Sequence, residues 1–237
     1  MITILTIIPA RSGSKSIKDK NIKLLNGKPL IQYSIDQAKN SKYSSQMRII
    51  VSTDSEKYAS ISKKLGAEVP FLRPDEISQD LSTDYQFIKH ALDYLEKEEN
   101  YIPDIVLQLR PTHPLRRVDK LDYCLDKFIE NRDKFDSLRS VLKLEKSPYK
   151  MYSIKDDKLI PLFKEVNGIR EPYNECRQHL PDSYLQVGYI DILNASIIKK
   201  GSITGDNVMP YLLENEEIVD IDTFKDWNRA EELLQNL

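Results

Sequence analysis

The residues best suited to chemistry follow directly on the first apolar run of the chain. Residues 8–21 read Ile-Pro-Ala-Arg-Ser-Gly-Ser-Lys-Ser-Ile-Lys-Asp-Lys-Asn. A buried strand that opens into such a loop is typical of a polyanion site, because ligands bind at the strand ends of α/β sheets. Arg11 supplies a planar fork, Lys15 and Lys20 supply point charges, and Gly13 frees backbone N–H groups for phosphate oxygens. The loop indicates a nucleotide or sugar-phosphate enzyme.

An acid pair near the C-terminus is the second candidate. Asp220 and Asp222 flank Ile221, and in a strand residues two apart point to the same face, where two carboxylates repel each other. A divalent cation removes that repulsion, and Mg²⁺ prefers one or two carboxylates together with phosphate oxygens. The alternative is two solvated acids at a strand end. The phosphate-type loop in the same chain favours the metal site.

A third cluster, Leu-Arg-Pro-Thr-His-Pro-Leu-Arg at 109–116, follows a predicted buried strand. Its prolines fix the backbone and hold Arg110, Thr112 and His113 in set directions. Such a loop is suited to base or sugar recognition. We interpret His113 as a binding residue and not as a general base.

The fourth cluster, Arg-Gln-His-Leu-Pro at 177–181, is followed by Tyr184 and Gln186. Arg177 and Gln178 beside a turn can grip a carboxylate through bidentate hydrogen bonds; a solvated loop charge is the alternative. No Ser/His/Asp order or nucleophile elbow stands out. This fits a reaction by positioning and charge neutralisation, such as in-line phosphoryl or nucleotidyl transfer.

Alternating strand and helix patterns position these clusters. The expected strands are 2–8, 48–52, 69–72, 105–109, 137–144, 187–193 and 218–221. Helices with apolar residues at helical spacing lie between most of them, one starting at Ser82 and the last at a Thr223–Asp226 capping box. The pattern predicts an α/β fold with a mostly parallel central sheet and helices on both faces.

Residues 1–237 are expected to form a single domain with an insertion at about 146–186. Prolines, tyrosines and a Lys-Asp-Asp-Lys turn at 155–158 interrupt the strand–helix rhythm there and favour a hairpin-rich segment. This segment can serve as an active-site lid or a dimer arm, and a plain surface excursion is the alternative.

Composition excludes several classes of protein. The 237 residues carry a net charge of −2, which does not favour nucleic-acid binding. Cys124 and Cys176 match neither a disulfide framework nor a zinc site. The first apolar run is too short for a signal peptide or a membrane span, so a cytoplasmic protein is expected.

The motifs together resemble the N-acylneuraminate (CMP-sialic acid) cytidylyltransferase family. The matching segments are Ile8–Asn21, Val51–Asp54, Leu72–Pro74, Arg110–Arg116, Arg177–Pro181 and Asp220–Thr223. The similarity covers nearly the whole chain and implies a Rossmann-like nucleotidyltransferase fold. It also implies a homodimer whose interface the insertion forms.

The resemblance implies that a nine-carbon 2-keto acid sugar of the sialic, legionaminic or pseudaminic type attacks the α-phosphate of CTP through its anomeric hydroxyl. Pyrophosphate leaves and a CMP-sugar forms. The implied nucleotide-binding residues are Ala10, Arg11, Gly13, Ser14, Lys15, Lys20, Asn21, Arg73 and Arg110. The implied sugar-binding residues are Arg110, Thr112, His113, Lys150, Arg177, Gln178, Tyr184 and Gln186. Arg11, Lys15 and Asp222 are the implied catalytic residues, and Asp220 and Asp222 would hold Mg²⁺.

Three positions depart from the family pattern. Ser16 replaces a glycine, Arg110 replaces a glutamine and His113 replaces a serine. Because an arginine can donate twice to guanine O6 and N7, a GTP-dependent equivalent that makes a GMP-sugar is the first alternative. A non-catalytic nucleotide-sugar binding protein is the second, and the intact cationic loop and acid pair argue against it.

Overall fold

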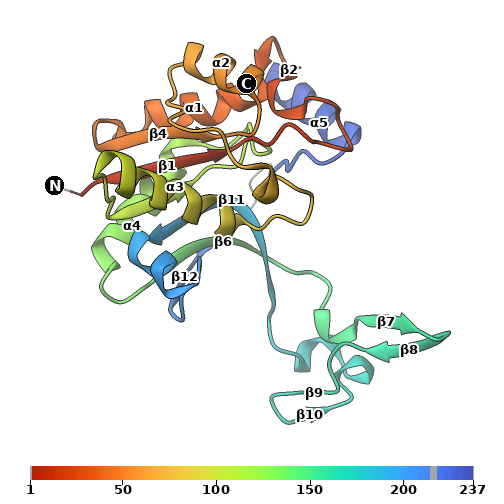
Figure 1. The fold of residues 1–237 in the computed structure, drawn as a ribbon. Coiled ribbons are helices and arrows are strands. Elements are labelled where there is room, and N and C mark those ends of the chain that lie inside the picture. The colour runs from red at the N-terminus through yellow and green to blue at the C-terminus, as the bar shows by residue number, and fades with distance from the viewer. Residues whose placement is uncertain (1, 214–217, 237) are drawn as a thin grey trace. The chain divides into compact units, whose positions relative to one another are not determined.

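The computed structural model describes residues 2–213 and 218–236 (Figure 1). They form two compact units. The first holds the described residues up to Ser140, those of Gly188–Tyr211 and those from 218 onward, and the second holds Val141–Val187 with 212–213.

The central sheet carries the candidate site at its strand ends. Its strands are β1 (Ile4–Pro9), β4 (Met47–Ser52), β5 (Ile105–Gln108), β6 (Ser137–Lys143), β11 (Tyr184–Asn194) and β12 (Val208–Leu212), in the order β12-β6-β11-β5-β1-β4. β1 pairs in parallel with β4 on one side and with β5 on the other, whereas β11 pairs antiparallel with β5. The predicted α/β fold is confirmed.

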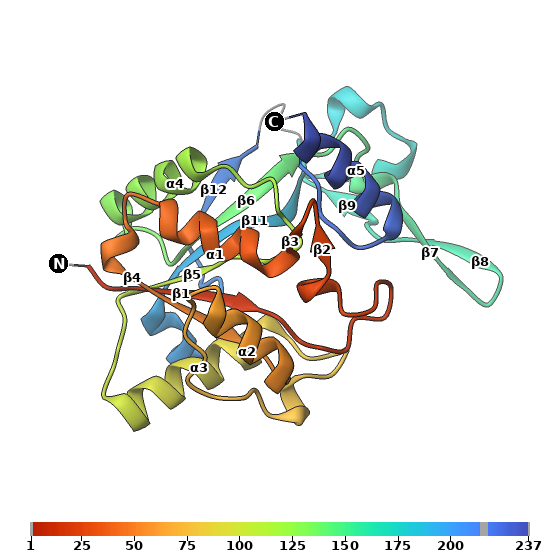
Figure 2. The ribbon, with the colours of Figure 1, turned by 90° about the horizontal axis from the view of Figure 1, so that it is seen from above.

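The main helices are α1 (Leu30–Asn40), α2 (Glu56–Lys64), α3 (Asp84–Glu99), α4 (Val118–Asn131) and α5 (Phe224–Gln235). Figure 2 shows α1 and α4 on one side of the sheet and α3 on the other. The α3 side is a core in which Leu5 and Ile7 of β1 pack with Ile88 and Leu95 of α3. α3 begins two residues after its expected start, because Thr83 and Gln86 form a capping box.

Short elements complete the first unit. They are η1 (Lys20–Ile22), β2 (Leu24–Leu25), β3 (Lys28–Pro29), η2 (Ser44–Gln46), η3 (Asp75–Ile77) and η7 (Ala195–Lys200). The Thr223–Asp226 capping box predicted for the last helix is present. Trp227 and Ala230 of that helix are buried against Ile17, Leu25 and Ile221.

Two predicted strands are wrong. Residues 69–72 form no strand with the residues that the structure describes, and a bridge between Ile50 and Glu68 precedes them; Pro70 has no N–H to continue the ladder. Residues 218–221 are irregular. The last strand is instead β12, which contains Pro210. A proline is tolerated there because β12 is an edge strand of the sheet.

The second unit contains the hairpins expected in the insertion. β7 (Tyr152–Lys155) pairs with β8 (Lys158–Pro161), and β9 (Glu165–Val166) pairs with β10 (Ile169–Arg170). The 155–158 turn has positive φ at both Asp156 and Asp157, which matches the right-handed twist of hairpin strands. The unit also holds η4 (Pro148–Lys150), η5 (Pro172–Asn174) and η6 (Arg177–His179). Its use as a lid or a dimer arm stays a prediction.

Candidate active site

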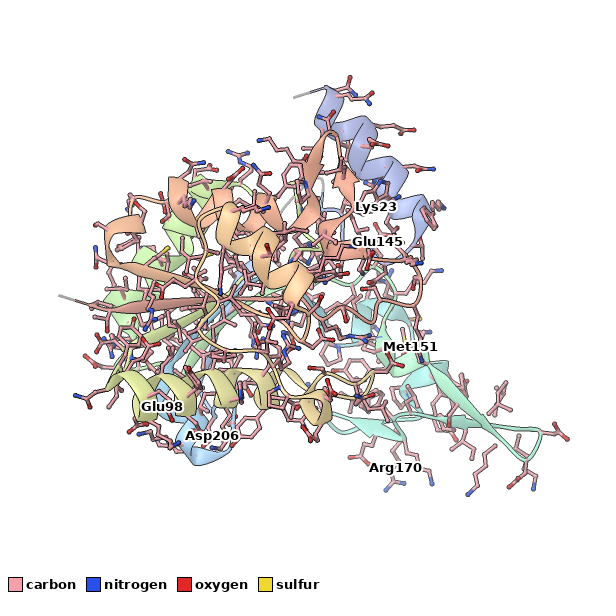
Figure 3. All side chains as sticks on the ribbon, turned by 45° about the horizontal axis from the view of Figure 1, so that its top comes forward. Lys23, Glu98, Glu145, Met151, Arg170 and Asp206 are labelled. Carbon is pink, nitrogen blue, oxygen red and sulfur yellow. The ribbon has the colours of Figure 1, made fainter. Side chains whose placement is uncertain are left out.

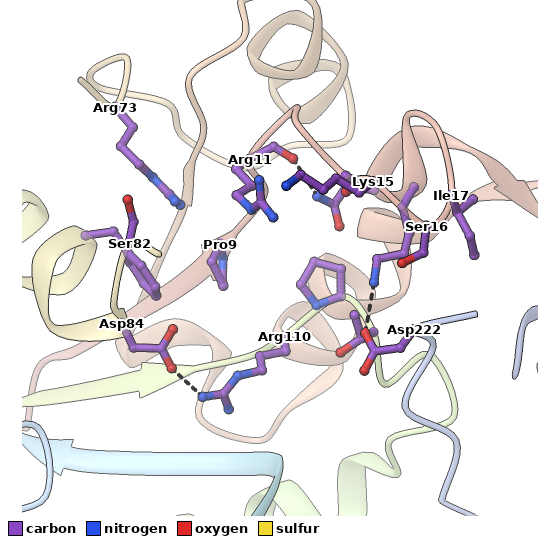
Figure 4. A pocket seen from close by; sticks show the side chains of 16 residues that line it. Pro9, Arg11, Lys15, Ser16, Ile17, Arg73, Ser82, Asp84, Arg110 and Asp222 are labelled. Atoms are coloured by element: carbon purple, nitrogen blue, oxygen red, sulfur yellow. Dashed lines mark hydrogen bonds and ion pairs between the residues drawn. The ribbon is translucent and has the colours of Figure 1, made fainter. Parts of the chain in front are cut away.

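A cavity of about 350 Å³ lies at the end of β1 in the first unit (Figure 4). Segments far apart in the sequence line it: the first loop, the start of α3, the loop after β5 and the segment before α5. The lining residues are Pro9, Arg11, Ser14, Lys15, Ser16, Ile17, Lys20, Asn21, Arg73, Ser82, Asp84, Phe87, Arg110, Pro111, Thr112 and Asp222. The structure thus brings the N-terminal cationic loop and Asp222 to one cavity.

The first loop is held by the end of the neighbouring strand β4. Ala10 is buried and donates its N–H to the Ser52 carbonyl, at 2.9 Å. Ser12 donates to Asp54 twice, from its backbone N (2.8 Å) and from Oγ (2.7 Å). Asn21 closes the loop from the other end by donating to the Arg11 carbonyl, at 3.1 Å. These bonds fix the backbone from which the cationic side chains project.

Gly13 leaves room for a close approach of the Arg11 side chain. Arg11 Nη1 donates to the Gly13 carbonyl at 2.9 Å, and a Cβ on residue 13 would lie 3.2 Å from the same Nη1. Ser16, which stands where the family pattern has glycine, is not among the residues with positive φ. A side chain at position 16 therefore causes no backbone strain.

The loop cations carry acidic partners from two different segments. Arg11 Nη2 lies 3.0 Å from Asp80 Oδ1, and Lys15 is paired with the same carboxylate. Lys20 Nζ donates to the Ile221 carbonyl at 2.6 Å and to Asp222 Oδ1 at 3.2 Å. Lys20 therefore joins the first loop to the segment that precedes α5.

The two acids have different surroundings. Ile221 is fully buried and donates its N–H to the Thr112 carbonyl at 2.9 Å, which fixes the segment although it forms no strand. Asp222 lines the cavity. Asp220 lies 3.8 Å from the Nε2 atom of His113. Burial raises the pKa of Asp220, a hydrogen bond from Thr112 lowers it, and the charge of Asp222 raises it again.

The acid pair fits a hard divalent cation in its donor type. In the described part of the chain no three His, Cys, Asp or Glu side chains are grouped as a metal centre. Two carboxylates are, however, the number that Mg²⁺ uses when ligand phosphates and water supply the other oxygens. Burial is the main cause of the raised pKa of Asp220, and the charge of Asp222 adds to it; a cation would remove that second contribution.

We predict that Asp220→Asn raises the free energy of unfolding at neutral pH, by no more than about 1 kcal/mol because the side chain is partly exposed. The raised pKa means that the fold disfavours the ionised form of Asp220. The wild type therefore keeps its full stability below the unfolded pKa, where the carboxyl is protonated, and loses stability as pH rises. The advantage of the variant should therefore vanish below the ordinary value of 3.8. Urea unfolding in EDTA between pH 3 and pH 8 measures it. A variant less stable than the parent at pH 7 would contradict the assignment.

His113 does not line the cavity. Its side chain is 1% exposed and its ring packs edge-on against Tyr189, with centroids 5.7 Å apart. His113 lies beside Asp220 and away from the cavity, where its ring packs under the 109–116 loop and supports it. Thr112, one residue earlier, is the one that faces the cavity.

Arg73 forms part of the cavity wall as a buried cation. It donates from Nε to Ser52 Oγ (3.0 Å) and from Nη2 to the Ser52 carbonyl (2.6 Å). Its guanidinium carbon lies 4.7 Å from the ring centroid of Phe87. Burial lowers the pKa of Arg73 to about 10, which still leaves the side chain charged at neutral pH.

Arg110 is held by two carboxylates that the sequence analysis did not single out. Its Nη1 bonds Asp191, which is fully buried in β11, and its Nη2 bonds Asp84 at the start of α3 (Figure 4). Arg139 Nη1 also lies 2.9 Å from Asp191. Burial lowers the pKa of Arg110, but Asp191 and Asp84 outweigh it and the pKa lies above its usual value. No local signal relates these residues, because they lie on four different segments.

Arg116, the last residue of the 109–116 cluster, holds the same loop from inside. It is buried and donates from Nη2 to the Arg110 carbonyl (2.9 Å) and from Nη1 to Gln37 Oε1 (2.5 Å). Burial lowers its pKa to about 10. Arg116 thus has a structural place in the loop that Arg110 and Thr112 present to the cavity.

The remaining predicted sugar-binding residues belong to the second unit. Lys150 and Arg177 line one hollow of about 470 Å³, together with Glu145, Lys146, Ser147 and Met151 (Figure 3 labels Glu145 and Met151). Gln178 follows Arg177 in η6, and Tyr184 and Gln186 are exposed on β11. The structure brings Lys150 and Arg177 together within this unit. Neither cysteine is in a disulfide: Cys124 is buried and Cys176 is exposed.

Comparisons with known proteins agree with this geometry. The Cytidylyltransferase family model matches residues 5–158. The chain is 31% identical over 223 residues to pseudaminic acid cytidylyltransferase of Campylobacter jejuni, which covers 94% of this chain and 92% of that one. It is 34% identical over 240 residues to CMP-N,N'-diacetyllegionaminic acid synthase of Legionella pneumophila, with 98% and 96% covered.

A solved structure shares the fold. It is CMP:2-keto-3-deoxy-manno-octonic acid synthetase complexed with CTP, which matches with a TM-score of 0.71 and 14% identity over 99% of this chain and 100% of that one. The two proteins therefore share one architecture, a Rossmann-like sheet covered by helices. The chain belongs to the cytidylyltransferase family, which confirms the predicted resemblance. Within the described residues, no helix has the length and apolarity to cross a membrane.

Proposed function

We propose that the protein transfers CMP from CTP to the anomeric hydroxyl of a nine-carbon 2-keto acid sugar and releases pyrophosphate. Its relatives carry the names of enzymes for pseudaminic and diacetyllegionaminic acids, which supports this class of acceptor. The observation that carries the proposal is the cavity in which Arg11, Lys15, Lys20 and Asp222 meet.

The charges of this cavity suit nucleotidyl transfer. Negative charge builds up on the α-phosphate and on the departing pyrophosphate, and fixed cations stabilise both. Arg11 can bind two phosphate oxygens at once, whereas Lys15 and Lys20 act as point charges. The sugar hydroxyl is the nucleophile, so the protein needs no covalent intermediate and no nucleophilic side chain of its own.

We propose Mg²⁺ as the cofactor, held by Asp220 and Asp222. When bound, the ion would act as a Lewis acid that offsets charge on the phosphate oxygens. Asp222 lines the cavity, and its charge is one of the effects that raise the pKa of Asp220, which supports a cation held by both acids.

We propose CTP in preference to GTP as the nucleotide. The argument for guanine depended on two donors of Arg110 directed at one base edge. Both terminal nitrogens of Arg110 are bonded to carboxylates of the protein, Asp191 and Asp84. These two bonds fix the orientation of the guanidinium, so it is not free to turn its donors toward a guanine edge, and the argument for GTP is weakened.

For the acceptor, we propose that Lys150 and Arg177 bind the sugar carboxylate. They line one hollow in the second unit, and an arginine pairs with a carboxylate in a planar, bidentate manner. We also propose that this unit forms the interface of a homodimer, as the family resemblance implies.

The test is a matrix of pyrophosphate-release assays. Purified protein with Mg²⁺ is incubated with each of the four nucleoside triphosphates and with sialic, legionaminic, pseudaminic and 3-deoxy-octulosonic acids. We expect release with CTP and at least one nine-carbon acid, and none without the sugar. Release with GTP alone would overturn the choice of nucleotide. Nucleotide binding without release in any combination would favour the binding-protein alternative.

A further inference from the structure

Two cations of the first loop share one carboxylate. Asp80 Oδ1 lies 3.0 Å from Arg11 Nη2, and Asp80 Oδ2 is paired with Lys15 Nζ. All three side chains are partly or largely exposed, with exposed fractions of 33% for Arg11, 78% for Lys15 and 40% for Asp80. Since the phosphates of a nucleotide are expected to bind Arg11 and Lys15, Asp80 occupies the cations that the phosphates need.

Asp80 is presented by a turn that has internal hydrogen bonds besides this ion pair. Gln79 donates its N–H to Ser82 Oγ (2.9 Å), and Ser82 donates its N–H back to the Gln79 carbonyl (3.1 Å). Gln79 Nε2 also donates to the Asp75 carbonyl, at 2.8 Å. The turn thus has its own hydrogen bonds, and among the described residues its ion pairs with the first loop are those of the Asp80 carboxylate.

Asp80 carries a negative charge at neutral pH, because its pKa lies below the ordinary value. Hydrogen bonding to Lys15 is the largest of the effects that lower its pKa, and Arg11 adds to it. A triphosphate carries several negative charges, so a carboxylate beside it is repelled while both compete for the same two cations. The carboxylate and the phosphates cannot both pair fully with Arg11 and Lys15.

We propose that Asp80 is a displaceable counter-ion of the phosphate site, which sets how tightly the protein holds a triphosphate or pyrophosphate. Phosphates displace Asp80 as they bind, and Asp80 takes the cations back as pyrophosphate leaves. A ligand with one phosphate that does not reach Arg11 and Lys15 is unaffected. The inference rests on the proposed function, because it assigns these two cations to the phosphates of the substrate.

The experiment is isothermal titration calorimetry of CTP, pyrophosphate and CMP with the wild-type protein and with Asp80→Asn, at low and at high salt. At low salt we expect the variant to bind CTP and pyrophosphate about 3- to 10-fold more tightly, since each exposed ion pair contributes modestly. The gain should shrink at 0.5 M salt, because such pairs are screened, and the affinity for CMP should stay unchanged.

Asp75→Asn is the matched control. It removes the same charge from an exposed aspartate on the same segment, and it should leave all three affinities as they are. An Asp80→Asn variant that binds CTP and pyrophosphate equally or more weakly would overturn the inference, since Asp80 would then position the cations. An equal gain in Asp75→Asn would also overturn it, because net charge would be the cause.

The failure of the proposed function can be distinguished from the failure of this inference. If the wild type binds CTP but Asp80→Asn binds it no better, only the inference is wrong. If the wild type binds pyrophosphate but not CTP, the proposed function is wrong and the effect of Asp80 is still measured with pyrophosphate. If the wild type binds none of the three ligands, both are wrong.

Discussion

Replacing Asp222 by alanine should lower the turnover number of the CMP transfer on the order of 10²- to 10³-fold, the loss typical of removing one group that stabilises transition-state charge. The fold should persist, because Asp222 is exposed and its neighbour Ile221 carries the packing. Initial rates of pyrophosphate release at several Mg²⁺ concentrations measure the effect, and thermal unfolding verifies the fold.

Two further variants separate the roles of Asp222. An asparagine at 222 keeps an acceptor for Lys20, which lies 3.2 Å from Asp222 Oδ1, but it removes the charge. If the charge matters, Asp222→Asn should lose as much activity as Asp222→Ala; if only the bond to Lys20 matters, it should retain most. Asp93→Ala, which breaks a surface ion pair on α3, is the matched control and should retain its activity. Full activity in Asp222→Ala would end the metal assignment.

The second large effect is on stability. We expect Arg110→Met to lower the free energy of unfolding by roughly 1–3 kcal/mol, because the buried carboxylate of Asp191 would lose one of its two cationic partners and keep only Arg139. The exposed fraction of Asp191 is zero, and that of the Arg110 side chain is 23%. Urea unfolding measures the loss.

The neighbouring acids provide the comparison for Arg110→Met. Asp84 is 34% exposed, so Asp84→Asn should cost at most about 1 kcal/mol. Arg110→Met combined with Asp191→Asn should cost less than the sum of the single changes, because the pair is removed together. If Arg110→Met unfolds like the wild type but changes nucleotide or sugar preference, Arg110 is a substrate selector, as the sequence comparison with the family suggested, and its bonds to Asp84 and Asp191 contribute little.

The first loop shows what a sequence can predict. An apolar run followed by Pro9, Arg11, Gly13 and Lys15 is a local pattern, and both the strand and the cationic loop it predicts are present. The helices were predicted for the same reason, since 3.6-residue spacing lies within one stretch of chain. The capping box before α5 is local too.

The errors come from properties that are not local. Residues 218–221 have the composition of a strand but are irregular in the structure. β12 was not predicted, because Pro210 argues against a strand unless the strand lies at the edge of the sheet. Whether β11 runs parallel or antiparallel to β5 depends on how the chain returns to the sheet, which no spacing encodes. The ion pairs that hold Arg110 could not be predicted from the sequence, because Asp84 and Asp191 lie far from it in the chain and approach it only in the folded protein.

The bond from Lys20 to the backbone at Ile221 joins residues 201 positions apart. During translation, the cationic loop therefore emerges from the ribosome long before the carbonyl and the carboxylate that complete its surroundings. A polypeptide cut short before residue 220 can still contain every strand of the sheet, yet it lacks Asp222 and the anchor of Lys20. If Asp222 is needed for catalysis as we propose, only a polypeptide synthesised into its last tenth can be active.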